Sequence, residues 1–270
     1  MENCLFTKVK DIVNNDAMSK IGELIIPIKY VEDAPTGLIS LTETEGFHVE
    51  ALDGGYFSLS DDFSIENRKT SHDFQHFTGL IHKMYIPNIN FRISISSKYV
   101  IKSISLSSSS SENLGSKRMV LDLEKLYGCS LLESLTTSRF DVIGRLSDIA
   151  DIPLKSITSY YGESLKGNLS DLSKHDALTV VNIQSGLKLD GELADLGENT
   201  SLTTINLLNA VNVYGSVEDF VVAQRNASTP RVTSSGITVN LGGTNITYQG
   251  EPVPTGSRTL SWTESSISLV

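Results

Sequence analysis

The sequence predicts an α/β multi-domain protein in which a short solenoid of repeats lies between two β modules. Three observations support this fold class. Apolar residues recur with a long, fixed period in the middle of the chain, and short runs that alternate apolar and polar residues flank this region on both sides. The chain has 270 residues, of which 39% are hydrophobic and 20% charged, so it has the composition of a globular protein and the length for more than one domain.

The repeat units start at Leu121, Gly144, Gly167, Gly191 and Gly215. Subtraction gives spacings of 23, 23, 24 and 24 residues, a period typical of leucine-rich-repeat solenoids. Counted from each start, apolar residues recur at offsets 2, 5, 11, 14 and 16. In the unit that starts at Gly167 they are Leu169, Leu172, Leu178, Val181 and Ile183. In the first two units, Thr137 and Ser159 interrupt the last of these columns; the second unit is one residue shorter after its helix, so its later columns come one residue earlier.

Within each unit we expect a helix over offsets 0 to 8 and a strand over offsets 11 to 17. Gly128 and Gly197 follow two of the expected helices and are placed as C-caps. Because side chains alternate along a strand, offsets 11, 14 and 16 would point inward and offsets 13, 15 and 17 would line an exposed sheet. The predicted solenoid, a parallel sheet plus helices, covers residues 99–229 with a serine-rich loop at 107–116.

Residues 1–98 are predicted to form an N-terminal β-sandwich-like domain that serves for attachment. Strand-sized runs lie at Leu24–Ile28, Thr36–Leu41, Phe47–Leu52 and Phe91–Ser96, and Asp53-Gly54-Gly55 is a turn signal. The next segment, Tyr99–Leu106, has two interpretations. It either closes the sandwich or, since Ile101, Ile104 and Leu106 have the spacing of a repeat strand, opens the solenoid; we favour the second.

The C-terminal part begins with a helix from Ser216 to about Asn226, in which Ser216 and Asp219 form a near capping box. No strand of the repeat type follows at the expected offset, so the solenoid is predicted to stop there with the helix as a lid. Residues 230–270 are predicted to be a small β-hairpin module, in which Gly242-Gly243 connects a strand at 237–241 to a second at 246–248.

Residues that could carry chemistry are few. His72 and His76 would share a face if they lay on a helix, with His82 nearby, but a solvated or partly packed histidine cluster is favoured over a metal site. Asp61, Asp62 and Asp73 could act as paired carboxylates, although acidic turns are common. There is no G-x-S-x-G elbow, phosphate-binding glycine loop or Cys/His nucleophile pair. We expect no enzyme, no metal and no cofactor.

The exposed sheet of the repeats is the remaining candidate for function. Offset 15 carries Thr136, Thr158, Asn182 and Asn206, and Tyr160 and Gln184 lie beside this column. Hydroxyl and amide groups can hydrogen-bond sugars or peptide backbone without the desolvation cost of full charges. The alternative is that these side chains are β-formers on a solvated face.

Charge and hydropathy restrict the partners. The net charge of −10 argues against nucleic acid or an anionic membrane, and no basic run, such as Lys117-Arg118, is longer than two residues. No apolar run reaches the length of about 18–20 residues that spans a bilayer. The opening MENCLFTKVKDIVNND lacks the apolar core of a secretory signal, so we expect folding in the cytoplasm.

Two parts of the sequence resemble a known group. GNLSDL at Gly167 and GELADL at Gly191, with LTTINL at Leu202, resemble leucine-rich repeats in virion proteins of Bacteroidetes phages, including crAss-like phages. The stretches NCLFTKVK at Asn3 and KIGEL at Lys20 are similar to N-termini in that group. The resemblance covers the N-terminus and residues 121–226, covers the middle of the β domain poorly, and transfers no individual functional residue.

The resemblance implies a virion structural protein that is assembled in the bacterial host cytoplasm. We expect a head fibre or capsid-surface decoration that binds phage capsid or tail proteins, forms a homo-oligomer and contacts host surface glycans. A tail-fibre adhesin is the first alternative. A polysaccharide-degrading enzyme that uses Asp61, Asp62 and Asp73 is the second.

Overall fold

The computed structural model describes residues 22–26, 37–43, 47–51, 57–59, 65–74, 82–86, 91–95, 101–108, 120–126, 129, 131–138, 141–161 and 164–270. This part of the chain is mixed α/β, consisting mostly of strands, with parallel sheets and few helices. The chain divides into two compact units, Met1–Ile143 and Gly144–Val270.

The first unit contains antiparallel sheets, as expected for a mostly β region. One has the strand order β1 (Gly22–Ile26), β8 (Phe91–Ile95), β3 (Phe47–Ala51) and β6 (Ser71–Phe74). A second has the order β9 (Ile101–Ser108), β2 (Gly37–Glu43), β7 (His82–Ile86), β4 (Phe57–Ser58) and β5 (Arg68–Lys69). A short 3₁₀ segment, Ile65–Asn67, precedes β5. The predicted turn Asp53-Gly54-Gly55 and most of the serine-rich loop lie outside the described residues.

Strand β9 satisfies both interpretations of the segment 99–106. It pairs antiparallel with β2, with Leu41 opposite Ile104, and parallel with β11 (Ser134–Ser138), with Leu135 opposite Ile104. It therefore belongs to the N-terminal sheet and also starts the parallel series. A second parallel pair in this unit joins β10 (Val120–Asp122) to β12 (Asp141–Ile143).

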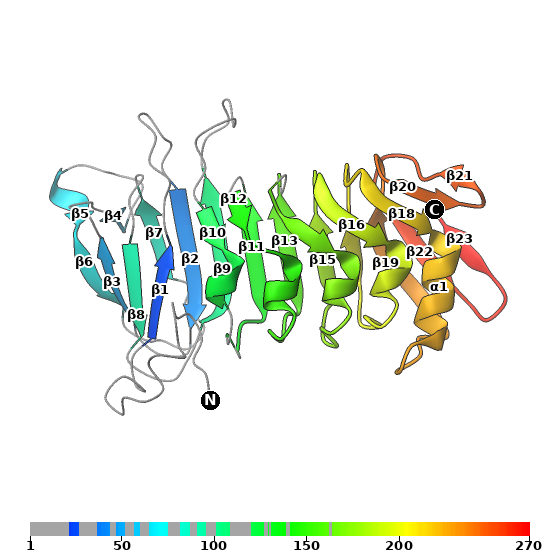
Figure 1. Cartoon of the computed structure of the whole chain (residues 1–270), viewed down its shortest axis with the longest axis horizontal. Helices are drawn as coiled ribbons and strands as arrows, with labels where there is room; N and C mark the ends of the chain where they lie inside the picture. Colours follow the sequence, from blue (N-terminus) through cyan, green and yellow to red (C-terminus); the bar gives the residue numbers. More distant parts are fainter. Residues whose placement is uncertain are drawn as a thin grey trace. The chain divides into compact units, whose positions relative to one another are not determined.

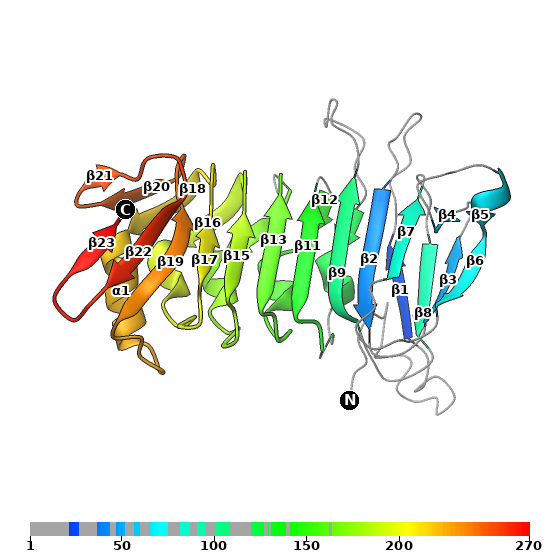
Figure 2. The ribbon, with the colours of Figure 1, turned by 180° about the vertical axis from the view of Figure 1, so that it is seen from behind.

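The second unit is a coil of repeats with two parallel rows of strands. One row is β13 (Ser156–Tyr160), β15 (Val180–Ile183), β17 (Thr204–Asn206) and β19 (Ser234–Asn240), which Figure 2 shows side by side. Ser156 pairs with Val180 and Val180 with Thr204, so this row keeps the 24-residue period. The other row is β14 (Lys166–Asn168), β16 (Lys188–Glu192), β18 (Asn212–Ser216) and β20 (Asn245–Tyr248).

The orientation predicted for the repeat strands is confirmed. Leu178, Val181 and Ile183, at offsets 11, 14 and 16, are fully buried. The interrupting residues Thr137 and Ser159 are also buried, so the sequence break in the last column is not a change of direction. The residues at offsets 13, 15 and 17 of the unit that starts at Gly167 are half-buried, as expected for an outer sheet face.

The predicted helices over offsets 0 to 8 are wrong in length and type. Each is a four-residue 3₁₀ segment: Leu123–Leu126, Leu146–Ile149, Leu169–Leu172 and Leu193–Leu196. The glycine that starts a unit is not helical: Gly167 lies in β14, Gly191 in β16 and Gly215 in β18, the second row of strands, and each has a positive φ. Figure 1 shows the helical segments of the second unit covering the side that lies away from β13, β15 and β17.

An aspartate at offset 4 explains why three of these four segments start where they do. The backbone N–H groups of Arg145, Asn168 and Glu192 donate to Asp148, Asp171 and Asp195, at N···O distances of 2.6, 2.9 and 2.9 Å. Each aspartate thus satisfies a backbone donor at the start of its segment, as a capping box does. The recurring phrase Leu-x-Asp followed by Leu or Ile is therefore a start signal for these three segments.

The prediction that the repeat stops after the helix, and that a hairpin follows, is wrong. Helix α1 (Val217–Asn226) occupies the place of the next 3₁₀ segment, and β19 then pairs parallel with β17, with Thr238 opposite Thr204. Strand β20 pairs parallel with β18, so Gly242-Gly243 carries the chain from one row to the other. Because α1 and its loop lengthen this unit to 238 − 204 = 34 residues, a search at a fixed offset misses the strand.

Antiparallel strands complete the second unit. β22 (Arg258–Trp262) pairs with β19, β23 (Ile267–Leu269) with β22, and β21 (Glu251–Pro252) with β20. The α1 residue Phe220 packs edge-on against Trp262, with ring centroids 6.3 Å apart, so the helix and these strands share one core. Among the described residues, no helix has the length and apolarity needed to cross a membrane.

Candidate functional site

Three residues of the predicted offset-15 column lie in register on neighbouring strands, on the outer face of the second unit. Thr158 of β13 lies opposite Asn182 of β15, and Asn182 lies opposite Asn206 of β17. The register continues to Asn240 of β19, which the fixed repeat period does not predict. We call Thr158, Asn182, Asn206 and Asn240 the polar row; neighbouring strands in a sheet are about 4.8 Å apart.

Asn240 was not predicted as part of the polar row, because its strand follows the lengthened unit. A signal was nevertheless present: VVN at Val180, TIN at Thr204 and TVN at Thr238 lie in register on three successive strands of the row. The three-residue phrase that ends in Asn recurs even where the spacing between units changes. The phrase, and not the offset, therefore identifies Asn240.

Hydrogen bonds hold part of the polar row in a fixed orientation. Gln184 Nε2 donates to Asn182 Oδ1 at 3.1 Å, and Asn182 Nδ2 donates to the hydroxyl of Tyr160 at 3.2 Å. Asn206 Oδ1 accepts from the backbone N–H of Leu208 at 3.3 Å. The predicted residues Tyr160, Asn182 and Gln184 are therefore one connected group.

The side chains of this group are accessible to different degrees. Tyr160 is 38% exposed, whereas Thr158 is 9% exposed, and Asn182, Gln184 and Asn206 are half-buried. Within the part of the chain that the structure describes, Asn240 Oδ1 is buried and lacks a hydrogen-bond partner. The row thus offers uncharged donors and acceptors beside an aromatic ring, partly shielded from water.

Thr136, the remaining predicted residue, belongs to the first unit. It lies on β11 opposite Ser105 of β9, and Ser105 in turn lies opposite Ser40 of β2. The register therefore aligns Thr136, Ser105 and Ser40 across three strands of the first unit.

The residues considered for metal or acid–base chemistry lie on strands where they are described. His72 and Asp73 are neighbours in β6 and pair in register with Val49 and His48 of β3, and His82 begins β7. Because His72 lies on a strand, it does not share a helical face with His76, and the spacing of four residues no longer indicates a metal-binding pair. His76, Asp61 and Asp62 lie outside the described residues. Within the described ranges, no group of three His, Cys, Asp or Glu side chains could hold a metal ion.

Comparisons with known proteins give no match: no family model, no curated protein and no solved structure resembles this chain significantly.

Proposed function

We propose that this protein is a non-enzymatic structural protein of a bacteriophage particle, a head fibre or capsid-surface decoration with a leucine-rich-repeat solenoid. The N-terminal β module would attach to capsid or tail proteins. The repeats would present the polar row to host surface glycans. Support comes from the resemblance of the repeat phrases to phage virion proteins and from the geometry of the row.

The observation that carries the binding role is the connected group Tyr160–Asn182–Gln184. Its amides and hydroxyl are already oriented by one another, which lowers the entropy lost when a ligand binds. Because none of the three is charged, covering them costs less desolvation free energy than covering ionised groups. Sugar hydroxyls, which both donate and accept, match such a surface.

Two alternatives remain. A tail-fibre adhesin would use the same polar row and differ in its place on the particle. A polysaccharide-degrading enzyme would depend on Asp61, Asp62 and Asp73, so changing each to Ala should abolish glycan hydrolysis by the purified protein. If no hydrolysis is measurable before the changes, this alternative is eliminated.

The test is to locate the protein on particles and then to alter the polar row in place. Antibody labelling and electron microscopy of purified particles should show the protein on the head. Label on the tail would favour the adhesin, and particles without the protein would reject the virion role.

The second arm uses particles that carry Asn182→Ala with Asn206→Ala. We expect normal incorporation but adsorption to host cells that is weaker by about tenfold, the loss of two hydrogen bonds of about 0.5–1.5 kcal/mol each. Asn226→Ala, at the exposed end of α1, is the matched control. Unchanged adsorption of the double variant would remove the polar row from the proposal while leaving the virion role standing.

A further inference from the structure

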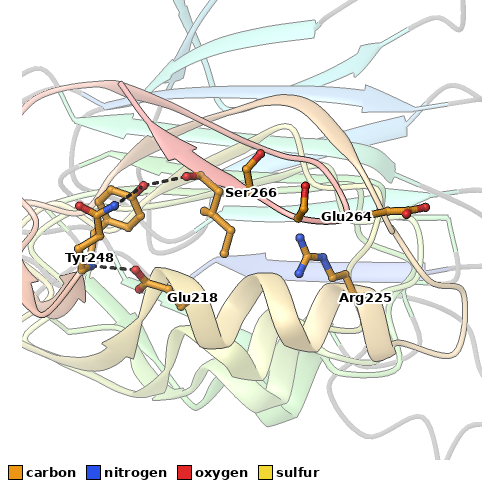
Figure 3. Close-up of a pocket in the computed structure, with 8 residues that line it drawn as sticks. Glu218, Arg225, Tyr248, Glu264 and Ser266 are labelled. Atoms are coloured by element: carbon orange, nitrogen blue, oxygen red, sulfur yellow. Dashed lines mark hydrogen bonds between the residues drawn. The ribbon is translucent and has the colours of Figure 1, made fainter.

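The second unit contains a groove that uses none of the residues of the polar row. It lies between α1, the end of β20 and the turn that joins β22 to β23, and its volume is about 310 Å³. That is the lower end of the range of about 300–1,000 Å³ for sites that hold small ligands. Figure 3 shows side chains from all three segments converging on it.

We propose that this groove binds a neutral saccharide.

The walls of the groove are fixed by contacts between segments far apart in the sequence. The backbone N–H of Gln249 donates to Glu218 Oε1 at 2.8 Å, and Tyr248 donates its hydroxyl hydrogen to the carbonyl of Ile267 at 2.9 Å. A terminal nitrogen of Arg225 donates to the carbonyl of Thr263. The groove is therefore pre-organised, and a ligand does not have to order its walls.

Hydrogen-bonding capacity remains after these contacts. A carboxylate offers about four acceptor positions and a guanidinium five donors, so Glu218 and Arg225 can take additional partners. The side chain of Gln249 donates to the Tyr248 hydroxyl at 3.3 Å, which orients its amide group. Donors and acceptors thus stand side by side, the arrangement that vicinal sugar hydroxyls require.

Charge selects among saccharides. The lining has two carboxylates, Glu218 and Glu264, and one guanidinium, that of Arg225. Figure 3 shows the carboxylate of Glu264 turned away from Arg225, whose guanidinium points toward the turn at Ser266. The lining therefore has a net charge of −1 and lies on a chain of net charge −10, which disfavours acidic sugars. The Tyr248 ring and Ile267 add the apolar surface that the C–H face of a pyranose contacts.

The experiment is ligand-observed NMR on the full chain. The probes are methyl glycosides of glucose, galactose, mannose and N-acetylglucosamine as neutral sugars, with glucuronic acid and glucosamine as charged ones. We expect saturation transfer to at least one neutral glycoside and not to glucuronic acid. Ser265→Leu, an exposed turn position in the lining, should fill the groove and weaken binding by about tenfold or more.

Ser268→Leu is the matched control, because Ser268, on β23, is also exposed but does not line the groove. A second variant, Arg225→Lys, keeps the charge but loses the planar donors, and it should weaken binding while its thermal unfolding is measured alongside. The proposal is overturned if no neutral glycoside binds, if only glucuronic acid or glucosamine binds, or if Ser265→Leu binds as tightly as Ser268→Leu. None of these outcomes bears on where the protein sits in a particle, so failure here leaves the virion proposal untouched.

Discussion

Three buried polar residues join successive units of the coil. His175 donates from Nδ1 to the carbonyl of Ile152 at 2.7 Å, and Asn199 donates from Nδ2 to the carbonyls of Leu172 and His175 at 2.9 and 3.0 Å. Gln224 of α1 donates to the carbonyls of Leu196 and Gly197 at 3.1 and 3.0 Å. Each of these side chains donates to carbonyl oxygens at or just after the end of the preceding helical segment, which have no hydrogen-bond donor within that segment.

These contacts have a cost at the other end of each side chain. His175 Nε2, Asn199 Oδ1 and Gln224 Oε1 are buried and, among the described residues, have no hydrogen-bond partner. A buried polar atom without a hydrogen-bond partner lowers the stability of the fold by about 1–3 kcal/mol. This loss is offset because each of the three residues hydrogen-bonds one or more backbone carbonyl oxygens. The exchange is favourable only while the imidazole stays neutral, because a buried charge costs far more.

Acid should therefore destabilise the fold through His175. Burial lowers the pKa of His175 below the ordinary value of 6.5, although the hydrogen bond to the Ile152 carbonyl and, to a smaller extent, the nearby Asp151 and Asp176 oppose this shift. Below pH 6.5 the unfolded chain binds a proton that the folded chain does not, so the free energy of unfolding falls as the pH decreases and levels off below the folded pKa.

The measurement is urea unfolding at a series of pH values, with His175→Asn as the matched variant. Asparagine stands at the same position of the next unit and supplies a donor without titrating. The other histidines remain, so the difference between the two proteins isolates His175. Parallel stability curves between pH 5 and 7 would contradict this account.

At the scale of the element, two units depend on a glycine, Gly167 or Gly191, that lets strands and a 3₁₀ segment pack closely. Gly191 has φ +121°, a conformation that side chains disfavour, and a Cβ there would lie 2.7 Å from Asn168 Oδ1 and 3.0 Å from the backbone nitrogen of Leu169. Asn168 is the N-cap of the preceding segment, so the glycine protects a cap as well as a strand.

Gly191→Ala should therefore lower the free energy of unfolding by about 2–4 kcal/mol, the sum of backbone strain and a forced shift of the cap. Gly256→Ala is the control: its φ is +116°, but no atom lies within 4 Å of the added Cβ. Both variants bear similar strain, so their difference in urea unfolding measures the packing alone. Equal losses would show that the close approach at Gly191 has no energetic weight.

At the scale of the whole molecule, we expect the chain to form a homo-oligomer. Most soluble homo-oligomers have closed point-group symmetry. Light scattering on the purified protein at micromolar concentration should give a mass that is a multiple of the monomer's. A strict monomer would count against a self-associating fibre. A decoration held in place only by the capsid would still be compatible with it.

Much of the architecture could be predicted from the sequence because it follows from periodicity. The start residues of the units and the inward columns came directly from counting, and β13, β15 and β17 lie where expected. A further apolar column was present but overlooked: Leu165, Leu189 and Val213, each two residues before the glycine that starts the next unit, are buried in the core. Recognising that column would have indicated the second row of strands.

The candidate site was predictable in part. Thr158, Asn182 and Asn206 share one face because side chains alternate along strands in register, which a fixed period specifies. Asn240 was not found, because its strand follows a unit lengthened by α1 and a fixed period cannot follow an insertion. The groove could not be foreseen at all, since Arg225, Tyr248 and Ser266 have no common spacing.

The sequence by itself determined that this protein is built from repeats and which side chains face the core. It also determined that the side chains at offsets 13, 15 and 17 of the repeat strands are uncharged. Local chemistry suffices for these properties, because each unit repeats the same burial pattern along the chain. Only the tertiary structure decided that the helices are single 3₁₀ turns and that the coil continues past α1. Both depend on pairing between strands distant in sequence: the second row takes the residues before each segment, and β17 provides the edge on which β19 forms.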